Sequence, residues 1–295
     1  MRNLPLSWIY SPSHPFQIKP INLLDKNFIW LALAISPTLN FINEIKNGCG
    51  VNKILIRGCD EKISEVLFEY GYKRIYSGQE AVLNFSTNHF KKKSLRHLIR
   101  RGSRHGKIIE YIYSINVADK LQQFKRQCSH AHEPQLKNLF CTEFSDQMKL
   151  YVFEDHRKEW LGAVMVSRNS ETKLHTELLL RKWNAPVGIM ESLIFHIFEN
   201  LKNNGIIELS LGEVPFIMSK NRDNISIKDH IINRIGKSLR CVYNYKGLYN
   251  FKNKFNPEWN DIYICGKPNI SFINLFLLSL RTNFFRLLLY KLFKK

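Results

Sequence analysis

Hydrophobic and polar positions alternate along the chain in a way that predicts a mixed α/β fold. In the second half, "MKLYVFED" and "EWLGAVMVSRN" are typical of a hairpin turned at 155–158, and "KLHTELLLRK" is typical of a third strand. The helical period of "GIMESLIFHIFENLKNNG", ended by Asn204 and Gly205, predicts an amphipathic helix, and "IIELSLG" predicts the next strand. Strand, helix and strand at this spacing predict a parallel β-α-β unit.

The first half shows a similar order of elements. A strand in "KILIRG" is followed by a helix in "EKISEVLFEYGY" and by two strands, "KRIYS" and "EAVLNFS". Before them, "FIWLALAISPTLNFINEIKNG" predicts a helix interrupted at Pro37. We therefore predict an arm over 1–27, two similar domains in tandem over 28–145 and 146–268, and an apolar, basic C-terminal helix over 269–295.

The segment "SLRHLIRRGSRHG" predicts a helix with two distinct faces. Leu95, Leu98, Ile99 and Gly102 form one apolar stripe, whereas Arg96, Arg100 and Arg104 are four apart and are flanked by His97 and Arg101. Residues 91–107 hold eight Lys or Arg and no acid. The candidate nucleic-acid contacts are Lys91, Lys92, Lys93, Arg96, Arg100, Arg101 and Arg104, together with Lys254 further along the chain.

Composition sharpens this picture. The 295 residues are 44 % hydrophobic, which excludes a disordered chain. The formal net charge of +19 implies a polyanionic partner, either a nucleic acid, an anionic membrane surface or both. The alternative is that a composition rich in Lys, Asn and Ile reflects an AT-rich genome, but it explains the clustered charge poorly.

The cysteines and apolar runs bear on the compartment. Six cysteines without a Cys-x-x-Cys pair are typical of reduced thiols in a reducing compartment. The run "CSHAH" fits no standard zinc pattern, so we predict no metal. We find neither a signal peptide nor a run of about 20 uncharged apolar residues, so we expect a cytoplasmic protein, peripheral at the inner face of the cell membrane.

The tail "SFINLFLLSLRTNFFRLLLYKLFKK" is apolar and ends in cations. On a single helix Arg281, Arg286 and Lys291 would project about 140° apart, so no single polar face forms. Two interpretations stay open. The tail lies in a membrane interface with its cations reaching the head groups, or it covers the protein core.

The stretch "YNYKGLYNFKNKFNPEW" alternates aromatic rings with lysines. On a helix, Lys252 projects within about 40° of Leu248, on the apolar face. Such a lysine either extends to solvent or points into a cleft. In a cleft it would stabilise an oxyanion or bind a phosphate, and its pKa would be lowered by desolvation. Lys254 points to solvent or to a phosphate backbone.

Three blocks in this order resemble a known family: "SGQEAVLNFSTNHFKKKSLRHLIRRGSRHGKIIEYI", "APVGIMESLIFHIFENLKNNGIIELSLGEVPF" and "LYNFKNKFNPEWNDIYI". The family is the soluble C-terminal domain of bacterial phosphatidylglycerol lysyltransferases, also called multiple peptide resistance factors, and the resemblance covers about residues 50 to 265. It implies two GNAT-type domains in tandem, similar to the Fem-type aminoacyltransferases. It also implies transfer of an aminoacyl group from a charged tRNA to a hydroxyl or amine, such as the head group of an anionic phospholipid, without a cofactor or metal.

The resemblance implies a site at the end of the "IIELSLGE" strand. There Lys252 would contact the oxyanion or a 3′-terminal phosphate, and Glu213 would take a proton from the acceptor or bind the amino acid's ammonium. The alternative for Glu213 is an exposed loop acid. The candidate substrate-binding residues are Arg181, Glu191, Ser210, Gly212 and Tyr249.

The sequence also departs from the family. The acid expected three residues before Arg181 is replaced by Leu178, and Glu177 is offset by one position, which in a strand points to the opposite face. This puts lysine as the transferred group in question, although Glu191 stands where the family has an acid. The multi-helix membrane half of the full-length enzymes is also missing, so the acceptor could be a lipid, a peptide or a small polyol.

Two other functions compete with this one. The first is an acyl-CoA-dependent GNAT acyltransferase, but the turn "RKWNAPVGIME" that would hold the pyrophosphate has a single glycine and a proline. The second is a non-catalytic module that binds RNA or membrane, suggested by the basic helix and the missing acid at Leu178.

Overall fold

The computed structural model describes residues 21–23, 28–31, 53–168, 172–202, 205–217, 234, 236 and 244–293. The described strands are β1 (Ile21–Asn22), β2 (Phe28–Leu31), β3 (Lys53–Cys59), β4 (Lys73–Asn84), β5 (Gly106–Tyr111), β6 (Met148–Asp155), β7 (Trp160–Arg168), β8 (Lys173–Arg181), β9 (Glu208–Pro215) and β10 (Glu258–Lys267). The described helices are α2 (Glu61–Glu69), α3 (Lys93–Ser103), α4 (Ile115–Lys125), α5 (Ile189–Leu201), α7 (Tyr245–Asn253), α8 (Phe272–Arg281) and α9 (Phe284–Phe293).

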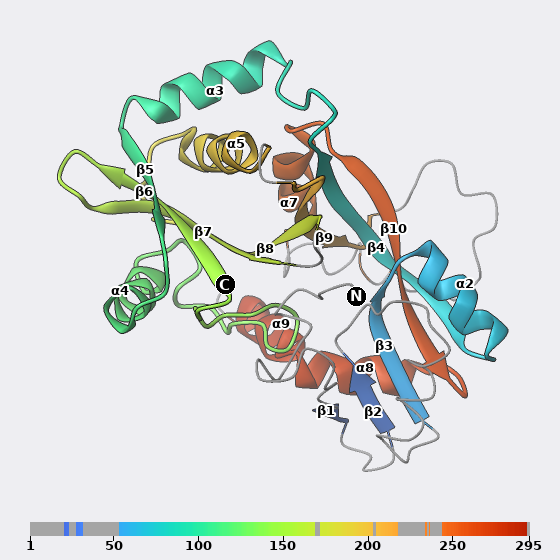
Figure 1. Cartoon of the computed structure of the whole chain (residues 1–295). Coiled ribbons are helices and arrows are strands. Elements are labelled where there is room, and N and C mark those ends of the chain that lie inside the picture. The colour runs from blue at the N-terminus through green and yellow to red at the C-terminus, as the bar shows by residue number, and fades with distance from the viewer. Residues whose placement is uncertain are drawn as a thin grey trace.

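The strands form one mixed sheet in the order β1-β2-β3-β10-β4-β9-β8-β7-β6-β5 (Figure 1). The predicted hairpin is confirmed as β6 and β7, and the predicted third strand as β8. The predicted β-α-β unit is confirmed as well, because β8 and β9 pair in parallel and α5 connects them. The mixed α/β class is therefore confirmed.

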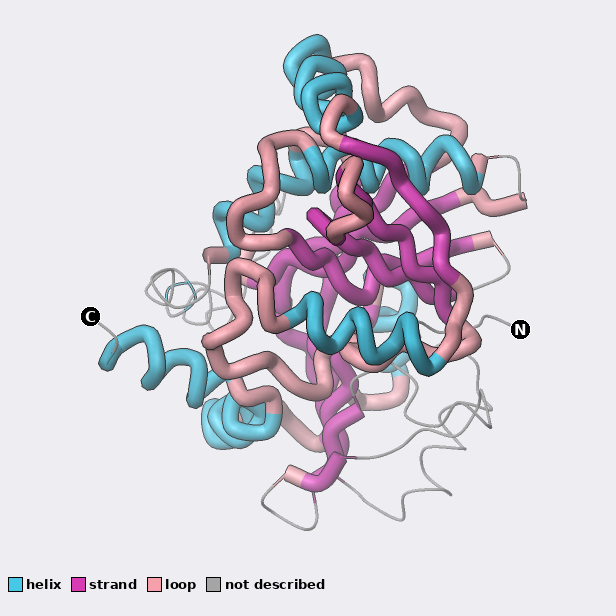
Figure 2. The backbone as a smooth tube through the Cα atoms, turned by 90° about the vertical axis from the view of Figure 1, so that its left-hand side faces the viewer, coloured by secondary structure: helices cyan, strands magenta, loops and turns pink. Residues whose placement is uncertain are grey.

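Helices cover both faces of the sheet (Figures 1 and 2). Side chains that alternate along β6 show this directly. Tyr151 and Phe153 belong to the core beneath α3 and α5, whereas Leu150 and Val152 belong to the core beneath α4. Both cores are fully buried at these positions, which explains the nearly continuous apolar sequence of β6 and β7.

Three predicted elements are wrong in detail. The two short strands around Gly78 are one strand, β4, because this glycine lets β9 approach: a Cβ there would lie 2.2 Å from the Val214 carbonyl oxygen. The helix predicted from Phe28 begins instead as strand β2, parallel to β3, and its continuation over 32–52 lies outside the described residues. The single C-terminal helix is two helices, α8 and α9, because Asn283 adopts a left-handed φ of 59° between them.

The sheet interleaves the two halves of the chain. Strand β10, from the end of the segment predicted as the second domain, lies between β3 and β4 of the first and is antiparallel to both. Strand β9 pairs with β4 on the other side of that strand. The domain boundaries at 27, 145 and 268 stay a prediction, and the N-terminal arm lies largely outside the described residues.

The close crossing of α3 and α5 gives a first testable expectation. A Cβ on Gly102 would lie 2.3 Å from the Gly188 carbonyl oxygen, and the Ser192 hydroxyl already donates to the Ile99 carbonyl oxygen at 2.9 Å. Because backbone cannot yield as a flexible side chain does, we expect Gly102→Ala to lower the free energy of unfolding by about 2 kcal/mol or more. Urea denaturation would measure it, with His97→Ala on the exposed face as control. Equal midpoints for the two variants would contradict this packing.

Candidate active site

Helix α7 carries the central lysine of the site. Its N-terminus is capped by Asn244, whose side chain accepts a hydrogen bond from the Gly247 backbone N–H at 2.9 Å. Phe255, just beyond the helix, is fully buried, and Lys252 on the same face is only 2 % exposed. Of the two interpretations of Lys252, extension to solvent is therefore wrong, and the side chain is held inside the protein.

The surroundings of Lys252 determine its charge. Its Nζ donates to the Glu213 backbone carbonyl oxygen at 3.2 Å. Burial lowers the pKa of Lys252 to about 7, against the opposing effect of the Glu213 and Glu80 carboxylates. At neutral pH the amine is thus divided between its charged and neutral forms, as is typical of functional lysines.

A β-bulge shapes the strand that faces this amine. Glu213 pairs with Glu80 and Ser210 pairs with Val82, so three steps on β9 oppose two steps on β4. The extra residue is accommodated by Gly212, whose φ of +84° is unfavourable for other residues. A Cβ on Gly212 would lie 3.5 Å from the Lys252 Nζ, so the bulge brings the strand backbone close to the amine.

A buried polar network lies beside the bulge. The Ser210 hydroxyl donates to the Glu80 carboxylate at 2.5 Å and accepts from the Gly212 backbone N–H at 3.0 Å. His175 Nδ1 lies 3.1 Å from the same hydroxyl oxygen and must be the donor, because the only hydroxyl proton is given to Glu80. Lys173 pairs with the other Glu80 oxygen at 3.1 Å. Every member of this network therefore has a partner.

The network's charges are set by burial and by neighbouring groups. Burial alone would raise the pKa of Glu80, but the Lys173 charge and the Ser210 hydrogen bond outweigh it, and the pKa is lowered. Burial lowers the pKa of His175, against the opposing effect of the Glu177 and Glu80 carboxylates. Glu80 is therefore ionised and His175 neutral at pH 7.

Glu213 is held by partners on both carboxylate oxygens. Arg57 pairs with one oxygen at 2.6 Å, and the Ser77 hydroxyl donates to the other at 3.0 Å. The side chain is mostly buried within β9. The alternative of an exposed loop acid is therefore wrong, and the carboxylate has a fixed position one residue from Gly212.

Glu177, which precedes Leu178, occupies a bulge in β8. Met165 pairs with Leu178 while the residue after Met165 pairs with Thr176, so Glu177 is the extra residue. Glu177 accepts a hydrogen bond at 2.6 Å from the Ser167 hydroxyl, and Ser167 lies two residues from Met165, on the same face. The expectation that the one-residue offset points Glu177 away from the face of Leu178 is wrong, because the bulge returns both side chains to one face.

The site lies where two parallel strands separate. Strands β8 and β9 pair at only three positions, the last of which joins His175 to Ser210. Gly212, Glu213 and the Lys252 amine all lie just beyond that point. In α/β sheets, a place where neighbouring parallel strands part is a usual location for ligands.

The other candidate substrate-binding residues have contacts of their own. Glu191, buried in the first turn of α5, pairs with Lys254 at 2.7 Å, so two candidates bind each other. The Tyr249 ring stacks on Trp259 with centroids 4.8 Å apart. Arg181 donates to the Ala185 carbonyl oxygen and stands six residues beyond His175, or about 20 Å along β8. Their binding roles stay predictions.

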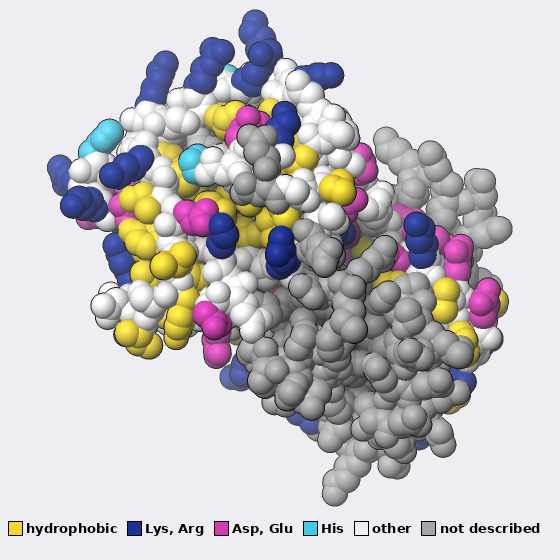
Figure 3. Space-filling view, in the orientation of Figure 1, with side chains coloured by type: hydrophobic (Ala, Val, Ile, Leu, Met, Phe, Trp, Pro, Cys, Tyr) yellow, Lys and Arg dark blue, Asp and Glu magenta, His cyan; other side chains and the backbone are white. Residues whose placement is uncertain are grey.

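The two faces of α3 are confirmed. Leu95, Ile99 and Gly102 are buried, and the cations of the helix are exposed along the edge of the molecule (Figure 3). The exposed cations are Lys91, Lys92, Lys93, Arg96, Arg100, Arg101 and Arg104. Lys254 differs from them, since its partner Glu191 already neutralises it.

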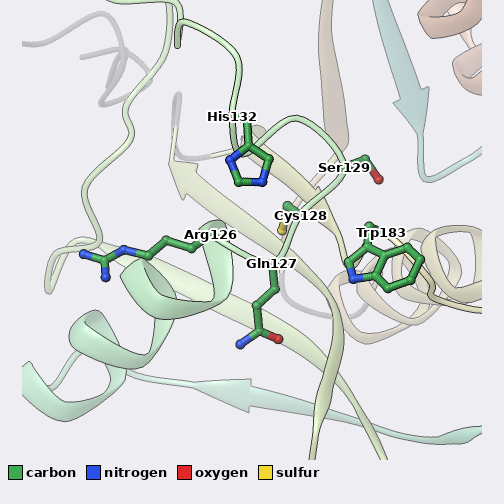
Figure 4. A pocket seen from close by; sticks show the side chains of 6 residues that line it. All are labelled: Arg126, Gln127, Cys128, Ser129, His132 and Trp183. Atoms are coloured by element: carbon green, nitrogen blue, oxygen red, sulfur yellow. The ribbon is translucent and has the colours of Figure 1, made fainter.

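The "CSHAH" run borders an open cavity of about 450 Å³ (Figure 4). Its lining residues are Arg126, Gln127, Cys128, Ser129, His132 and Trp183. Burial raises the pKa of the Cys128 thiol to about 11, so the thiol stays protonated. Within the described part of the chain, no three His, Cys, Asp or Glu side chains lie close enough together to hold a metal ion.

Sequence reasoning missed five contributors to the site: Arg57, Ser77, Glu80, Lys173 and His175. Two signals were available. Lys173, His175 and Glu177 occupy alternate positions of one predicted strand, and Glu80 begins another. Polar groups at buried strand positions need partners, so such runs point to a network. Which partners they meet depends on the strand order, which the sequence pattern does not contain.

Comparison with known proteins supports the family suggested by the sequence. The family described as "Phosphatidylglycerol lysyltransferase, C-terminal" matches residues 51–266. The phosphatidylglycerol lysyltransferase of Bacillus subtilis (strain 168) is 26 % identical over 110 residues, which are 37 % of this chain and 13 % of that protein. The chain thus spans a small part of that relative.

Two solved structures have a fold similar to that of this chain. The structure of L-PGS from Bacillus licheniformis aligns with a TM-score of 0.65 at 16 % identity, covering 84 % of this chain and 77 % of that one. The C-terminal domain of a putative lysylphosphatidylglycerol synthetase from Agrobacterium fabrum aligns with a TM-score of 0.61 at 19 % identity, covering 83 % and 77 %. With the family match over most of its length, the chain belongs to the family of phosphatidylglycerol lysyltransferase C-terminal domains.

Proposed function

We propose that the chain is a transferase that moves an aminoacyl group from a charged tRNA to the head group of an anionic phospholipid such as phosphatidylglycerol. The observation that carries this proposal is the buried Lys252, with a pKa of about 7, facing Gly212 where β8 and β9 part. A cationic donor fixed in a desolvated site is suited to the negative charge that develops in acyl transfer. Membership of the family supports the same reaction class.

The reaction needs only positioning and electrostatics from the protein. The acceptor hydroxyl oxygen attacks the ester carbonyl carbon, a new C–O bond forms, and the bond to the terminal ribose breaks. The proton lost by the acceptor passes to the ribose oxygen, so atoms and charge balance without a further reactant. The Lys252 ammonium stabilises the oxyanion, and the Glu213 carboxylate raises the fraction of ammonium present.

We propose that α3 binds the backbone of the tRNA donor, because its exposed face is uniformly basic. Changing Arg96, Arg100 and Arg104 to Gln should weaken tRNA binding and reduce the slope of log K against log salt by about 2 to 3. Filter binding over a salt series measures both. A matched triple variant with the same charge loss, at the exposed Lys62, Lys73 and Lys246, should keep the wild-type slope. The same slope change in both variants would remove α3 as the contact.

The transfer assay tests the reaction itself. Purified protein would be incubated with tRNA charged with a pool of labelled amino acids and with phosphatidylglycerol vesicles, and label would be followed into extractable lipid. Phosphatidylcholine vesicles serve as the matched acceptor control. Label in phosphatidylglycerol alone supports the proposal and identifies the amino acid. Label that stays on tRNA with every acceptor would refute it.

The acyl-CoA alternative predicts a different binding site. In that reaction class the N-terminus of a helix holds the pyrophosphate, and the corresponding helix here is α5, which follows β8. Here the first turn of α5 faces α3, with Gly188 against Gly102 and the Ser192 hydroxyl bonded to Ile99. A rise in melting temperature on adding CoA would favour this alternative, and we expect none.

A further inference from the structure

The pair formed by α8 and α9, here called the elbow (272–293), exposes an apolar face. Among the described residues, six of the thirteen exposed large hydrophobic side chains belong to it. Ile273 is 70 % exposed and Phe293 is 82 % exposed. The six residues are Phe272, Ile273, Phe276, Leu289, Leu292 and Phe293. Such clustering on one element marks an interaction surface.

The other side of the elbow packs on the protein. Leu278 is buried against Leu55 and Ile75 of the sheet, and Leu287 is buried as well. The rings of Phe276 and Phe285 pack edge to face with centroids 5.4 Å apart across the bend between the helices. The interpretation that the tail covers the core is therefore confirmed for one side of the elbow, whereas the membrane interpretation of the exposed side stays a prediction.

The elbow's length and bend limit how it can meet a membrane. No single helix in the described part of the chain is long and apolar enough to cross a bilayer. The two helices pass that test only together, and they are bent by 77° at Thr282 and Asn283. Each helix is about 15 Å long, shorter than the roughly 30 Å hydrocarbon layer, so this geometry favours lying on a membrane surface.

The charge of this segment favours an anionic surface. Asp261 is the last acid of the chain, and the residues after it include six Lys or Arg. Arg281 and Arg286 are exposed beside the apolar face. Exposed apolar side chains flanked by cations, with no acid in the segment itself, are typical of helices that bind anionic lipid. A protein partner of mixed charge would not require this one-sided composition.

A segment over 133–141, here called the strap, joins the elbow to the candidate active site. At one end, the Lys137 backbone N–H donates to the Thr282 carbonyl oxygen at 3.0 Å, and Lys291 binds Glu133. Two further bonds link Asn138 to Arg281 and Asn283 to Gln135.

At its other end the strap touches the site. Arg57, the partner of Glu213, donates to the Leu139 carbonyl oxygen at 3.3 Å. The Cys141 backbone N–H donates to the Glu177 carboxylate at 3.1 Å. The elbow and the strand ends near Lys252 are therefore connected through hydrogen bonds, and a docked elbow would hold the site at a fixed position above the lipid.

We propose that the elbow is the surface with which the chain docks on an anionic bilayer, and that the strap positions the site over the lipid head groups. The elbow begins after residue 266, where the family match ends, so it lies outside the matched region. It lies at the opposite end of the molecule from α3 (Figures 1 and 2). The positioning role rests on the proposed transfer to lipid, whereas the docking does not.

Vesicle binding tests the docking. The double variant Ile273→Glu/Phe293→Glu should bind phosphatidylglycerol vesicles at least about tenfold more weakly than wild type in co-sedimentation. The matched control is Ile112→Glu/Trp183→Glu, whose side chains are 78 % and 71 % exposed but lie outside the elbow. It should bind like wild type. Melting temperatures are measured to confirm that both double variants fold. The single variant Arg281→Gln should weaken vesicle binding about fivefold at low salt.

A second readout separates docking from catalysis. The elbow variant should lose transfer to vesicle lipid but keep transfer to a water-soluble glycerophosphoglycerol acceptor. Wild-type vesicle binding by this variant would overturn the docking proposal. So would a wild-type dimer that the variant converts to a monomer while vesicle binding is unchanged, since the face would then cover a second copy. If wild type transfers to neither acceptor, the proposed function fails, and the binding measurements still decide the docking.

Discussion

Lys252→Met is expected to lower the rate of aminoacyl transfer about 10²- to 10³-fold while leaving tRNA binding unchanged. Methionine fills a similar volume in the buried position but cannot donate to an oxyanion. The loss should appear in kcat rather than in the affinity for tRNA, because the interaction develops as the carbonyl oxygen gains charge.

The pH profile makes this expectation sharper. Because the pKa of Lys252 is about 7, the wild-type kcat/KM should fall as the pH rises above 7 and the ammonium is lost. Lys252→Met should lack that decrease. Lys246→Met is the matched control, since it removes an exposed lysine of the same helix and should keep the wild-type decrease. A Lys252 variant with wild-type turnover would refute the catalytic role and favour a binding module.

The same lysine should make the stability of the fold depend on pH. The pKa of Lys252 is about 7 in the folded chain and near 10.5 when unfolded. Between these values the unfolded chain binds a proton that the folded chain does not, so the wild-type fold becomes more stable as the pH rises from 7 to 10.5. Below pH 7 both states are protonated, and this group adds no further pH dependence. Over this whole pH range the free energy of unfolding rises by at most about 5 kcal/mol.

Lys252→Met removes this dependence. The free energy of unfolding of the variant, relative to that of wild type, should be highest at pH 7 and below. This difference in free energy should decrease steadily toward pH 10. Urea denaturation of both proteins at a series of pH values measures the difference. Its change with pH is the decisive quantity, because the substitution also leaves the Glu213 carbonyl oxygen without its donor at every pH. A difference that is constant from pH 7 to 10 would show that the amine is not desolvated.

Local elements of this protein were predictable where the pattern was long and periodic. The β6–β7 hairpin, α3 and α5 have clear periods, and the structure contains them. The failures concern elements whose conformation depends on a distant partner. Gly78 suggests a turn in isolation, yet it lies within a continuous strand because β9 approaches there. Phe28–Leu31 is a short apolar run that fits a helix or a strand, and pairing with β3 decides the outcome.

The candidate site was predictable only in part for the same reason. The helical period alone placed Lys252 on an apolar face. Its closeness to Gly212 depends on a bulge in β9, and the position of Glu177 depends on a bulge in β8. Bulges arise from pairing between strands, and a single extra residue leaves no clear signature in the pattern of either strand.

The position of β10 has a consequence for how the chain becomes a folded protein. Its residues, 258–267, lie between two strands made about 200 residues earlier, so β3 and β4 have no bonding partner on their facing edges until then. During synthesis those strand edges stay unpaired until β10 has been made, and until then they can aggregate or bind chaperones. Folding should therefore be slow and largely post-translational. A chain that ends before β10 should remain incompletely folded and bind chaperones.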